Sequence, residues 1–299
     1  MTSSWASDRL ILMQIENCLV ILKQTALAQG GRAAALAKQG DATAKRLLAA
    51  DAEHNRTIEE VRKTLRRRKI PFSECPLTDL DARVKGQLAI ADFVVSIGGD
   101  GTALASSHYV RHGAMIGVNS APGDSVGHFC SVHRRNFAER LDAILKDEWK
   151  PVELARLLIT LDGKPLPELA LNDVLIAHDC PASTTRYLIQ IGDHEEEQRS
   201  SGLWISTAAG STAGIGSAGG KKMPRRSKRI QYLIRELYRE PNRTYQFTRG
   251  FLETGETITI ASKMAQGELY VDGARTMYPF PFGTRAQIKT AEDSLRLFF

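Results

Sequence analysis

The stretch FVVSIGGDGTALAS, residues 93–106, constrains the fold and chemistry of this chain more than any other segment. An apolar run typical of a buried strand leads directly into Gly98-Gly99-Asp100-Gly101-Thr102. Glycines tolerate positive φ, and because they lack a Cβ they leave backbone N–H groups open to a bulky anion. The carboxylate of Asp100 could then accept a proton from an attacking hydroxyl or help to hold Mg²⁺. The pattern predicts a phosphate-binding loop; a plain strand-to-helix turn capped by the aspartate is the alternative.

The composition is that of a globular protein rather than a membrane-spanning or disulfide-rich one. Of 299 residues, 42% are hydrophobic and 25% are charged, and no apolar run reaches the roughly 18 residues of a membrane span. The first twenty residues contain Asp8 and Glu16 and lack the pattern of a secretory or organellar leader. Four scattered cysteines without a CxxC pair argue against a disulfide framework or a zinc site. We therefore expect a cytoplasmic location and no membrane partner.

The net charge of +6 is concentrated in two basic runs, RKTLRRRK at 62–69 and KKMPRRSKR at 221–229. Solvated faces and a phosphate-rich ligand are both open explanations of these runs. Nucleic acid is the least favoured partner, because neither run has interleaved aromatic residues or a known reading motif. We therefore expect no nucleic-acid partner, and the role of the run at 221–229 stays open.

The first half of the chain alternates strand-like and helix-like segments. Strands are expected at 18–24, 69–75, 92–97 and 113–119, and helices within about 32–68 and 136–147. Thr57, which precedes paired acids, is typical of a helix start. This alternation predicts a parallel sheet covered by helices.

The second half changes to short strand-like runs separated by Asp-Gly or Pro-containing turns, as at 155–166, 169–177 and 185–193. In GETITIAS, threonines alternate with isoleucines at period two, so these runs predict a β-rich, sandwich-like domain of antiparallel strands. The segment SKRIQYLIRELYRE at 227–240 has instead an amphipathic helical pattern. We place the domains at 1–148 and 149–299, and the last twenty or so residues could pack back on the first domain.

A second glycine-rich stretch, STAAGSTAGIGSAGG at 206–220, offers hydroxyls and small side chains. Its GIGSAG segment matches GxGxxG only weakly, because the next acids lie in the helix-like segment rather than at a strand end. No GxxxxGK[ST] occurs, which excludes a Walker A loop. Such a stretch can lie against a planar ring and donate hydrogen bonds, and a flexible surface loop is the alternative.

Asn172-Asp173 interrupts the otherwise apolar run LALNDVLIA. One of the two side chains must therefore face inward or toward a ligand. A carboxamide beside a carboxylate suits a ribose diol or an adenine edge. A strand-end turn is the alternative.

Taken together, four segments resemble the NAD kinase family: GGDGT, GVNSAPGDSVGHFC, LND and QRSSGLWISTAAGSTAGIGSAGG, in the family's order and spacing. The resemblance covers almost the whole chain and is closer to the mitochondrial-type branch. It implies an N-terminal α/β domain, a β-rich C-terminal domain and an active site between them, often completed by another subunit of a homodimer or homotetramer. The implied reaction transfers the terminal phosphoryl group of ATP, or of polyphosphate, to the 2′-hydroxyl of the adenosine ribose of NAD, with Mg²⁺ as the divalent cation.

The resemblance also implies roles for individual residues. Asp100 matches the catalytic base, and Asn172 and Asp173 match the pair that holds the dinucleotide. The remaining positions assigned to nucleotide binding are Gly98, Gly99, Gly101, Thr102, Asn119, Arg199, Thr212, Ala213 and Ser217. No residue of the chain is assigned as a metal ligand.

Three departures from the family pattern bear on how the substrate is gripped. Common members carry Asp at Ser201, Pro at Ala208 and Tyr at Gly214, so this chain lacks a carboxylate and an aromatic ring there. Two other functions stay open: a lipid or other small-molecule kinase of the GGDGT superfamily, and a non-catalytic NAD(P)-binding regulator. The sequence also leaves open ATP against polyphosphate, NAD against NADH, and dimer against tetramer.

Overall fold

A computed structural model describes residues 15–40, 42–80, 82–123 and 127–299, so the prediction about a leader in the first twenty residues lies largely outside it. The chain separates into two compact units. The first comprises the chain up to Ala103, His112–Val152 and Leu297–Phe299, and the second comprises Leu104–Arg111 and Glu153–Arg296. Within the described ranges, no helix combines the length and the hydropathy that crossing a bilayer requires.

The first unit is built on a largely parallel sheet. Its strands are β1 (Cys18–Leu22), β2 (Phe72–Pro76), β3 (Phe93–Gly98), β4 (Ala114–Asn119) and β5 (Val132–His133), together with β6 (Val152–Leu154) and β19 (Leu295–Phe298), each of which belongs partly to the second unit. Among the described residues the strand order is β2-β1-β3-β4-β19-β6, with β5 beside β4. The pairs formed by β1 to β5 are all parallel, which confirms the predicted α/β class.

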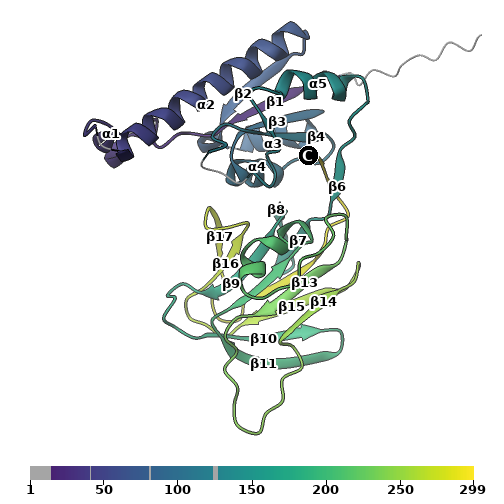
Figure 1. The fold of residues 1–299 in the computed structure, drawn as a ribbon. Coiled ribbons are helices and arrows are strands. Elements are labelled where there is room, and N and C mark those ends of the chain that lie inside the picture. The colour runs from purple at the N-terminus through teal and green to yellow at the C-terminus, as the bar shows by residue number, and fades with distance from the viewer. Residues whose placement is uncertain (1–14, 41, 81, 124–126) are drawn as a thin grey trace, which may run out of the picture. The chain divides into compact units, whose positions relative to one another are not determined.

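Helices cover both faces of this sheet (Figure 1). They are α2 (Ala42–Arg67), α3 (Ala82–Ile90), α4 (Asp100–Ser107) and α5 (Phe137–Leu145). The short helix α1 (Gly31–Ala37) has no buried residue and contacts α2 instead, and the 3₁₀ turn η1 (Leu77–Asp79) follows β2. Val61 of α2 and Leu141 of α5 pack into one hydrophobic cluster with the sheet. The predicted helix start at Thr57 is wrong: Thr57 is buried inside α2, where its hydroxyl donates to the carbonyl of Glu53 at 2.8 Å.

The second unit consists of two antiparallel sheets. One has the order β11-β10-β15-β18-β7-β8 and the other β14-β13-β12-β9-β16-β17. The first sheet contains β7 (Leu157–Leu161), β8 (Lys164–Ala170), β10 (Thr185–Ile191), β11 (His194–Ser200), β15 (Thr257–Ser262) and β18 (Arg285–Thr290). The second contains β9 (Asp173–His178), β12 (Leu203–Ser206), β13 (Ile230–Ile234), β14 (Arg249–Leu252), β16 (Gly267–Val271) and β17 (Thr276–Pro279).

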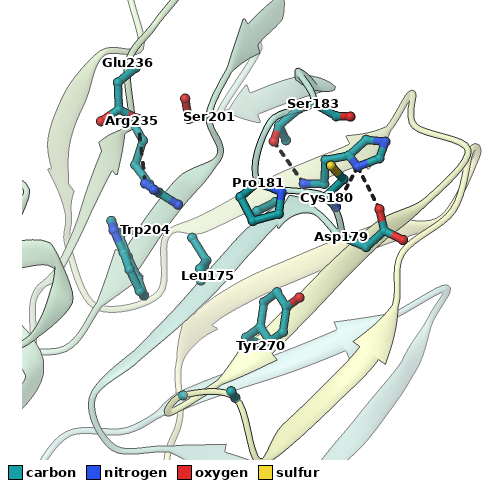
Figure 2. Close-up of a pocket in the computed structure, with 15 residues that line it drawn as sticks. Leu175, Asp179, Cys180, Pro181, Ser183, Ser201, Trp204, Arg235, Glu236 and Tyr270 are labelled. Carbon is teal, nitrogen blue, oxygen red and sulfur yellow. Dashed lines mark hydrogen bonds and ion pairs between the residues drawn. The ribbon is translucent and has the colours of Figure 1, made fainter.

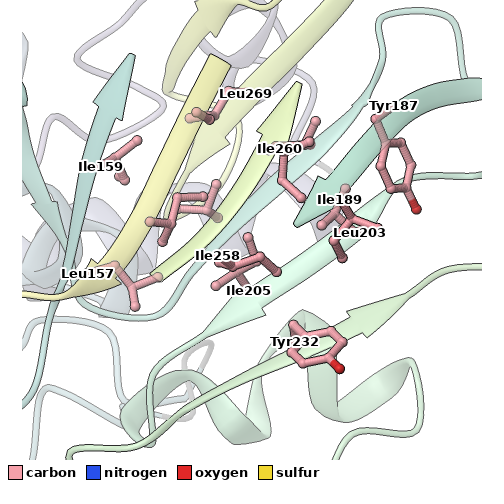
Figure 3. Packing of buried hydrophobic residues seen from close by; sticks show 14 of the residues in the cluster. Leu157, Ile159, Tyr187, Ile189, Leu203, Ile205, Tyr232, Ile258, Ile260 and Leu269 are labelled. Atoms are coloured by element: carbon pink, nitrogen blue, oxygen red, sulfur yellow. The ribbon is translucent and has the colours of Figure 1, made fainter. Parts of the chain in front are cut away.

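The core of the second unit follows from the period-two pattern of these strands. Ile258 and Ile260 are fully buried, and they pack with Ile189 of the same sheet and with Leu203 and Ile205 of the other (Figure 3). The alternating threonines, which point away from this core, are only partly buried. The predicted β-rich C-terminal fold is therefore confirmed.

The helix predicted at 227–240 is wrong. Residues 230–234 form β13, which pairs with β12 on one side and β14 on the other. Ile230, Tyr232 and Ile234 enter the hydrophobic core, and Gln231 and Leu233 between them are buried as well, so the whole strand is enclosed. The glycine-rich stretch ahead of β13 holds two short turns instead, η2 (Ala209–Thr212) and α6 (Gly214–Ser217).

Candidate functional site

Asp100 is the first residue of α4, directly beyond the carboxyl end of β3. Its half-buried carboxylate accepts the backbone N–H groups of Phe129 at 2.8 Å and His128 at 3.0 Å. A carboxylate offers about four lone-pair positions, so two hydrogen bonds leave capacity for a further donor. The side chain is therefore oriented by the backbone and can still accept a proton.

The glycines of this loop differ in what surrounds them. A Cβ on Gly98 would lie 2.3 Å from Oγ1 of Thr102 and 3.0 Å from Cβ of Lys23, so no side chain fits there. A Cβ on Gly101 would meet nothing within 4 Å, so the space beside the start of α4 is open. Neither Gly98 nor Gly101 adopts a left-handed φ. The loop thus uses these glycines for space rather than for unusual backbone angles.

The other nucleotide-binding residues predicted in the first unit gather at the same edge of the sheet. The N–H of Ser120 donates to the carbonyl of Gly98 at 3.0 Å, which joins the ends of β3 and β4. Asn119 and Thr102 are buried there, with 6% and 5% of their surface exposed. In a parallel sheet this carboxyl edge is where ligands bind.

A cavity of about 600 Å³ opens beyond the ends of β1 and β2, and Lys23, Asp51 and His54 are among its lining residues. Nδ1 of His54 lies 2.8 Å from Oγ of Ser120, and burial lowers the pKa of His54. Our sequence predictions missed Lys23 and His54. Lys23 could have been found, because it directly follows the apolar run of β1 and so stands at the carboxyl end of a parallel strand.

In the second unit, Asn172 and Asp173 lie where β8 turns into β9, and the glycine-rich stretch packs directly on them. The hydroxyl of Ser206 and the N–H of Thr207 both donate to the carbonyl of Asn172, at 3.0 and 2.9 Å. A Cβ on Gly210 would lie 2.2 Å from that carbonyl oxygen. Two motifs that are separate in the sequence are therefore one structural group.

The side chain of Asn172 contains an unpaired acceptor. Its Oδ1 is buried and has no hydrogen-bond partner among the described residues. Leaving such an acceptor unpaired costs about 1–3 kcal/mol, which a ligand donor such as an amine or a hydroxyl would recover. In the adjoining stretch Thr212 and Ser217 are exposed and Ala213 is half-buried. These small groups can surround a planar ring without steric conflict.

A second aspartate holds this pair in place. The fully buried carboxylate of Asp272 accepts the backbone N–H groups of Leu171, Asn172 and Asp173, at 2.8, 2.7 and 2.9 Å. Burial, together with the charge of Asp272, raises the pKa of Asp173 to about 7. Asp173 can therefore either accept or donate a proton near neutral pH.

Individual relatives, rather than family models, show which family the chain belongs to. No family model matches the chain. The probable NADH kinase of Oryza sativa subsp. japonica is 33% identical over 266 residues, which cover 82% of this chain and 81% of that protein. The chain belongs to the family of NAD and NADH kinases. The NADH kinase of Arabidopsis thaliana is 30% identical over 268 residues, with 82% and 83% of the two chains covered. Both relatives fit the resemblance to the mitochondrial-type branch.

The fold of the NAD kinase family also recurs among solved structures. An NAD kinase from Archaeoglobus fulgidus, crystallised in complex with ATP, aligns with a TM-score of 0.67 over 95% of this chain and 93% of that chain, at 18% identity. This match confirms the predicted NAD kinase-like fold.

The residues assigned from the NAD kinase resemblance fall into two groups. Gly98, Gly99, Asp100, Gly101, Thr102 and Asn119 lie at the sheet edge of the first unit, and Asn172, Asp173, Thr212, Ala213 and Ser217 lie together in the second. Arg199 stands apart: it is exposed on β11, in the other sheet, and its carbonyl accepts the N–H of Tyr238 at 2.9 Å. Among the described residues Arg199 makes no hydrogen bond with the second group.

Proposed function

We propose that this chain is an NAD kinase, which transfers the terminal phosphoryl group of ATP to the 2′-hydroxyl of the adenosine ribose of NAD or NADH. The observation that carries the proposal is the setting of Asp100. The chain places this carboxylate at the start of a helix, orients it with two backbone N–H groups, and leaves the space at Gly101 open. A phosphoryl donor and a hydroxyl acceptor need this combination of space and a fixed base.

Asp100 takes the proton of the attacking hydroxyl. As the ribose oxygen forms its bond to the terminal phosphorus, the bond from that phosphorus to the ADP oxygen breaks and the hydroxyl proton passes to the carboxylate. Such a base contributes about 10²- to 10⁴-fold to the rate. The rest of phosphoryl transfer depends on positioning and charge neutralisation. The backbone N–H groups of the loop at 98–102 and the ammonium group of Lys23 are suited to that task.

Mg²⁺ would come to this site with the phosphates of the donor. No group of three or more His, Cys, Asp or Glu side chains that could hold a metal lies in the described part of the chain, and Asp100 is the one carboxylate of the loop at 98–102. This donor set fits Mg²⁺, which proteins bind with one or two carboxylates together with substrate phosphates and water. When bound, the ion neutralises part of the phosphate charge.

The second unit would bind the dinucleotide. Oδ1 of Asn172 is available to accept from an adenine amine or a ribose hydroxyl, and Thr212 and Ser217 supply exposed hydroxyls. Asp173, with a pKa of about 7, supplies a carboxylate that accepts or a carboxyl group that donates, according to pH. Arg199 would contact substrate only if the bound ligand extends to β11, or if β11 borders the site of another subunit.

The finer features of the proposal rest on the relatives. NADH joins NAD as an acceptor because both of the plant relatives reported above are named NADH kinases. ATP is the proposed donor, with polyphosphate as the alternative, because the archaeal NAD kinase was crystallised in complex with ATP. A homodimer or homotetramer, and a cytoplasmic location in keeping with four scattered cysteines that form no CxxC pair, complete the proposal.

A donor-by-acceptor activity matrix tests the proposal. Purified full-length chain with Mg²⁺ is given ATP or polyphosphate, each with NAD or NADH, and the product is detected with an NADP-specific dehydrogenase. We expect product with ATP and at least one of the two acceptors. No product in any combination would overturn the proposal. Tight dinucleotide binding without turnover would then favour a regulator, and labelled phospholipid from lipid vesicles would favour a lipid kinase.

A further inference from the structure

A cavity of about 600 Å³ lies on the outer face of the sheet that carries Asn172 and Asp173 (Figure 2). Its apolar wall is formed by Leu175 of β9, Trp204 of β12 and Tyr270 of β16. The three residues are cross-strand neighbours, because Leu175 is paired with Trp204 on one side and with Tyr270 on the other. All three are only partly buried, unlike Ile176, Leu203 and Leu269, which face the core.

Trp204 joins this cavity to the glycine-rich stretch. A Cβ on Gly214 would lie 2.9 Å from two atoms of the Trp204 indole, so the ring fills the space that a side chain at position 214 would need. Gly214, at the position where common family members carry Tyr, therefore leaves room for the aromatic ring of Trp204. Gly214 directly follows Thr212 and Ala213, so the indole stands beside the groups proposed to bind the dinucleotide.

The rim of the cavity is polar and carries a guanidinium group. Arg235 lies beside Trp204 (Figure 2), and its one ion pair in the described part of the chain, with Glu236, is long at 3.9 Å. A guanidinium that is this weakly paired keeps donors for a phosphate or an amide carbonyl. The hydroxyl of Ser201 lines the same cavity, at the position where common family members carry Asp. Aromatic walls with an arginine at the rim suit a planar heteroaromatic ring on a phosphorylated ribose.

We infer that Trp204 stacks on a heteroaromatic ring of a bound nucleotide and is a specificity-determining residue of this chain. The inference rests on the proposed function for its ligand class. Two nucleotides share the required chemistry, namely the dinucleotide acceptor and the adenine nucleotide that serves as donor. Stacking of one base on an aromatic side chain contributes enough to change affinity roughly 5- to 150-fold.

Binding measurements on Trp204 variants test this inference without requiring turnover. Trp204→Phe keeps an aromatic face, whereas Trp204→Leu keeps an apolar side chain without one. Trp149→Phe is the control, because Trp149 packs on Phe298 at 5.3 Å in the first unit. Dissociation constants for NAD, NADH and ADP are measured by calorimetry, and a urea titration checks that each variant is folded.

We expect Trp204→Leu to weaken binding of either the dinucleotides or ADP by about 10-fold or more, and Trp204→Phe to stay within about 3-fold of wild type. The nucleotide whose binding weakens identifies the ring that stacks. Equal effects of the Leu and Phe variants on every nucleotide, or no effect of either, would overturn the inference. If Trp204→Leu fails to fold, Gly214→Ala serves instead, because its Cβ must displace the indole, and unchanged binding in that variant would likewise overturn it.

The activity matrix distinguishes a failure of the proposed function from a failure of the inference about Trp204. A wild-type chain that forms no NADP(H) but loses NADH affinity in Trp204→Leu would defeat the proposed function and support the role of Trp204. A wild-type chain that is active and whose Trp204→Leu variant binds all three nucleotides normally would support the proposed function and defeat the role of Trp204.

Discussion

Nε2 of His108 lies 2.8 Å from Oδ2 of Asp272, and neither side chain is more than 4% exposed. The same carboxylate accepts three backbone N–H groups from the turn that presents Asn172 and Asp173. Four donors thus converge on one buried group. Asp272 acts as a positioning residue, because it fixes the backbone from which the proposed dinucleotide contacts project.

Asp272→Asn is therefore expected to lower the free energy of unfolding by about 3 kcal/mol, because an amide NH₂ would face donors that need an acceptor. The KM for the dinucleotide should rise more than kcat falls, since the proposed chemistry at Asp100 is untouched. Urea titration and steady-state kinetics measure the two effects. Asp193→Asn, at an exposed residue in the turn between β10 and β11, is the control. A change of less than about 0.5 kcal/mol in Asp272→Asn would refute the positioning role.

Much of the fold could be predicted because local patterns and tertiary burial agree. The run at 93–97 is apolar except for Ser96 and forms a fully buried parallel strand, while 257–262 alternates and forms a strand with one buried face. The helix prediction for 227–240 was wrong because the apolar residues of this segment also satisfy helical spacing. They are Ile230, Leu233, Ile234 and Leu237. Its pairing with β12 and β14 decided the outcome, and a local pattern does not contain that information.

The candidate site likewise contains residues that local sequence patterns reveal and residues that only the folded structure reveals. Asn172 and Asp173 could be singled out because they interrupt an apolar run. Asp272 could not, because an Asp-Gly pair after a strand is the ordinary signature of a turn. Its partner Asn172 lies 100 residues earlier in the chain, so only the folded structure reveals the contact.

Gly98→Ala and Gly101→Ala should have opposite effects on stability. Gly98→Ala would place a methyl group 2.8 Å from Cβ of Thr102, so we expect a loss of about 1–3 kcal/mol in the free energy of unfolding. Gly101→Ala lies within α4 in open space, so we expect a gain of about 0.5–1 kcal/mol together with a clear loss of kinase activity. Thermal unfolding and initial rates distinguish the two. Full activity in Gly101→Ala would show that no phosphate approaches this helix start.

Asp173 should make stability depend on pH in a direction unusual for an aspartate. Its pKa is raised from the usual 3.8 to about 7 in the folded chain, so the folded state holds a proton that the unfolded state releases. Stability is therefore lost as the pH rises from about 4 to about 7, by at most about 4 kcal/mol. Asp173→Asn cannot ionise, so its advantage over wild type should grow across this window and level off above it. Urea titrations at pH 4.5, 6 and 8 measure the difference, and a constant difference would contradict the raised pKa.

Asp100→Asn tests the proposed base directly. Asparagine keeps one oxygen for the N–H groups of residues 128 and 129 but cannot accept the hydroxyl proton, so we expect kcat to fall about 10²- to 10⁴-fold while the fold is retained. Asp92→Asn is the matched control. Asp92 also accepts two backbone N–H groups, from Glu16 at 3.1 Å and Asn17 at 2.8 Å, but it precedes β3 at the opposite end of the strand.

The two variants should therefore lose similar stability, about 1–2 kcal/mol, and differ in activity. Near wild-type turnover in Asp100→Asn would remove Asp100 from the reaction, whatever its effect on folding. An equal loss of activity in Asp92→Asn would show that the defect comes from a disturbed sheet, because no chemistry is assigned to that end of β3.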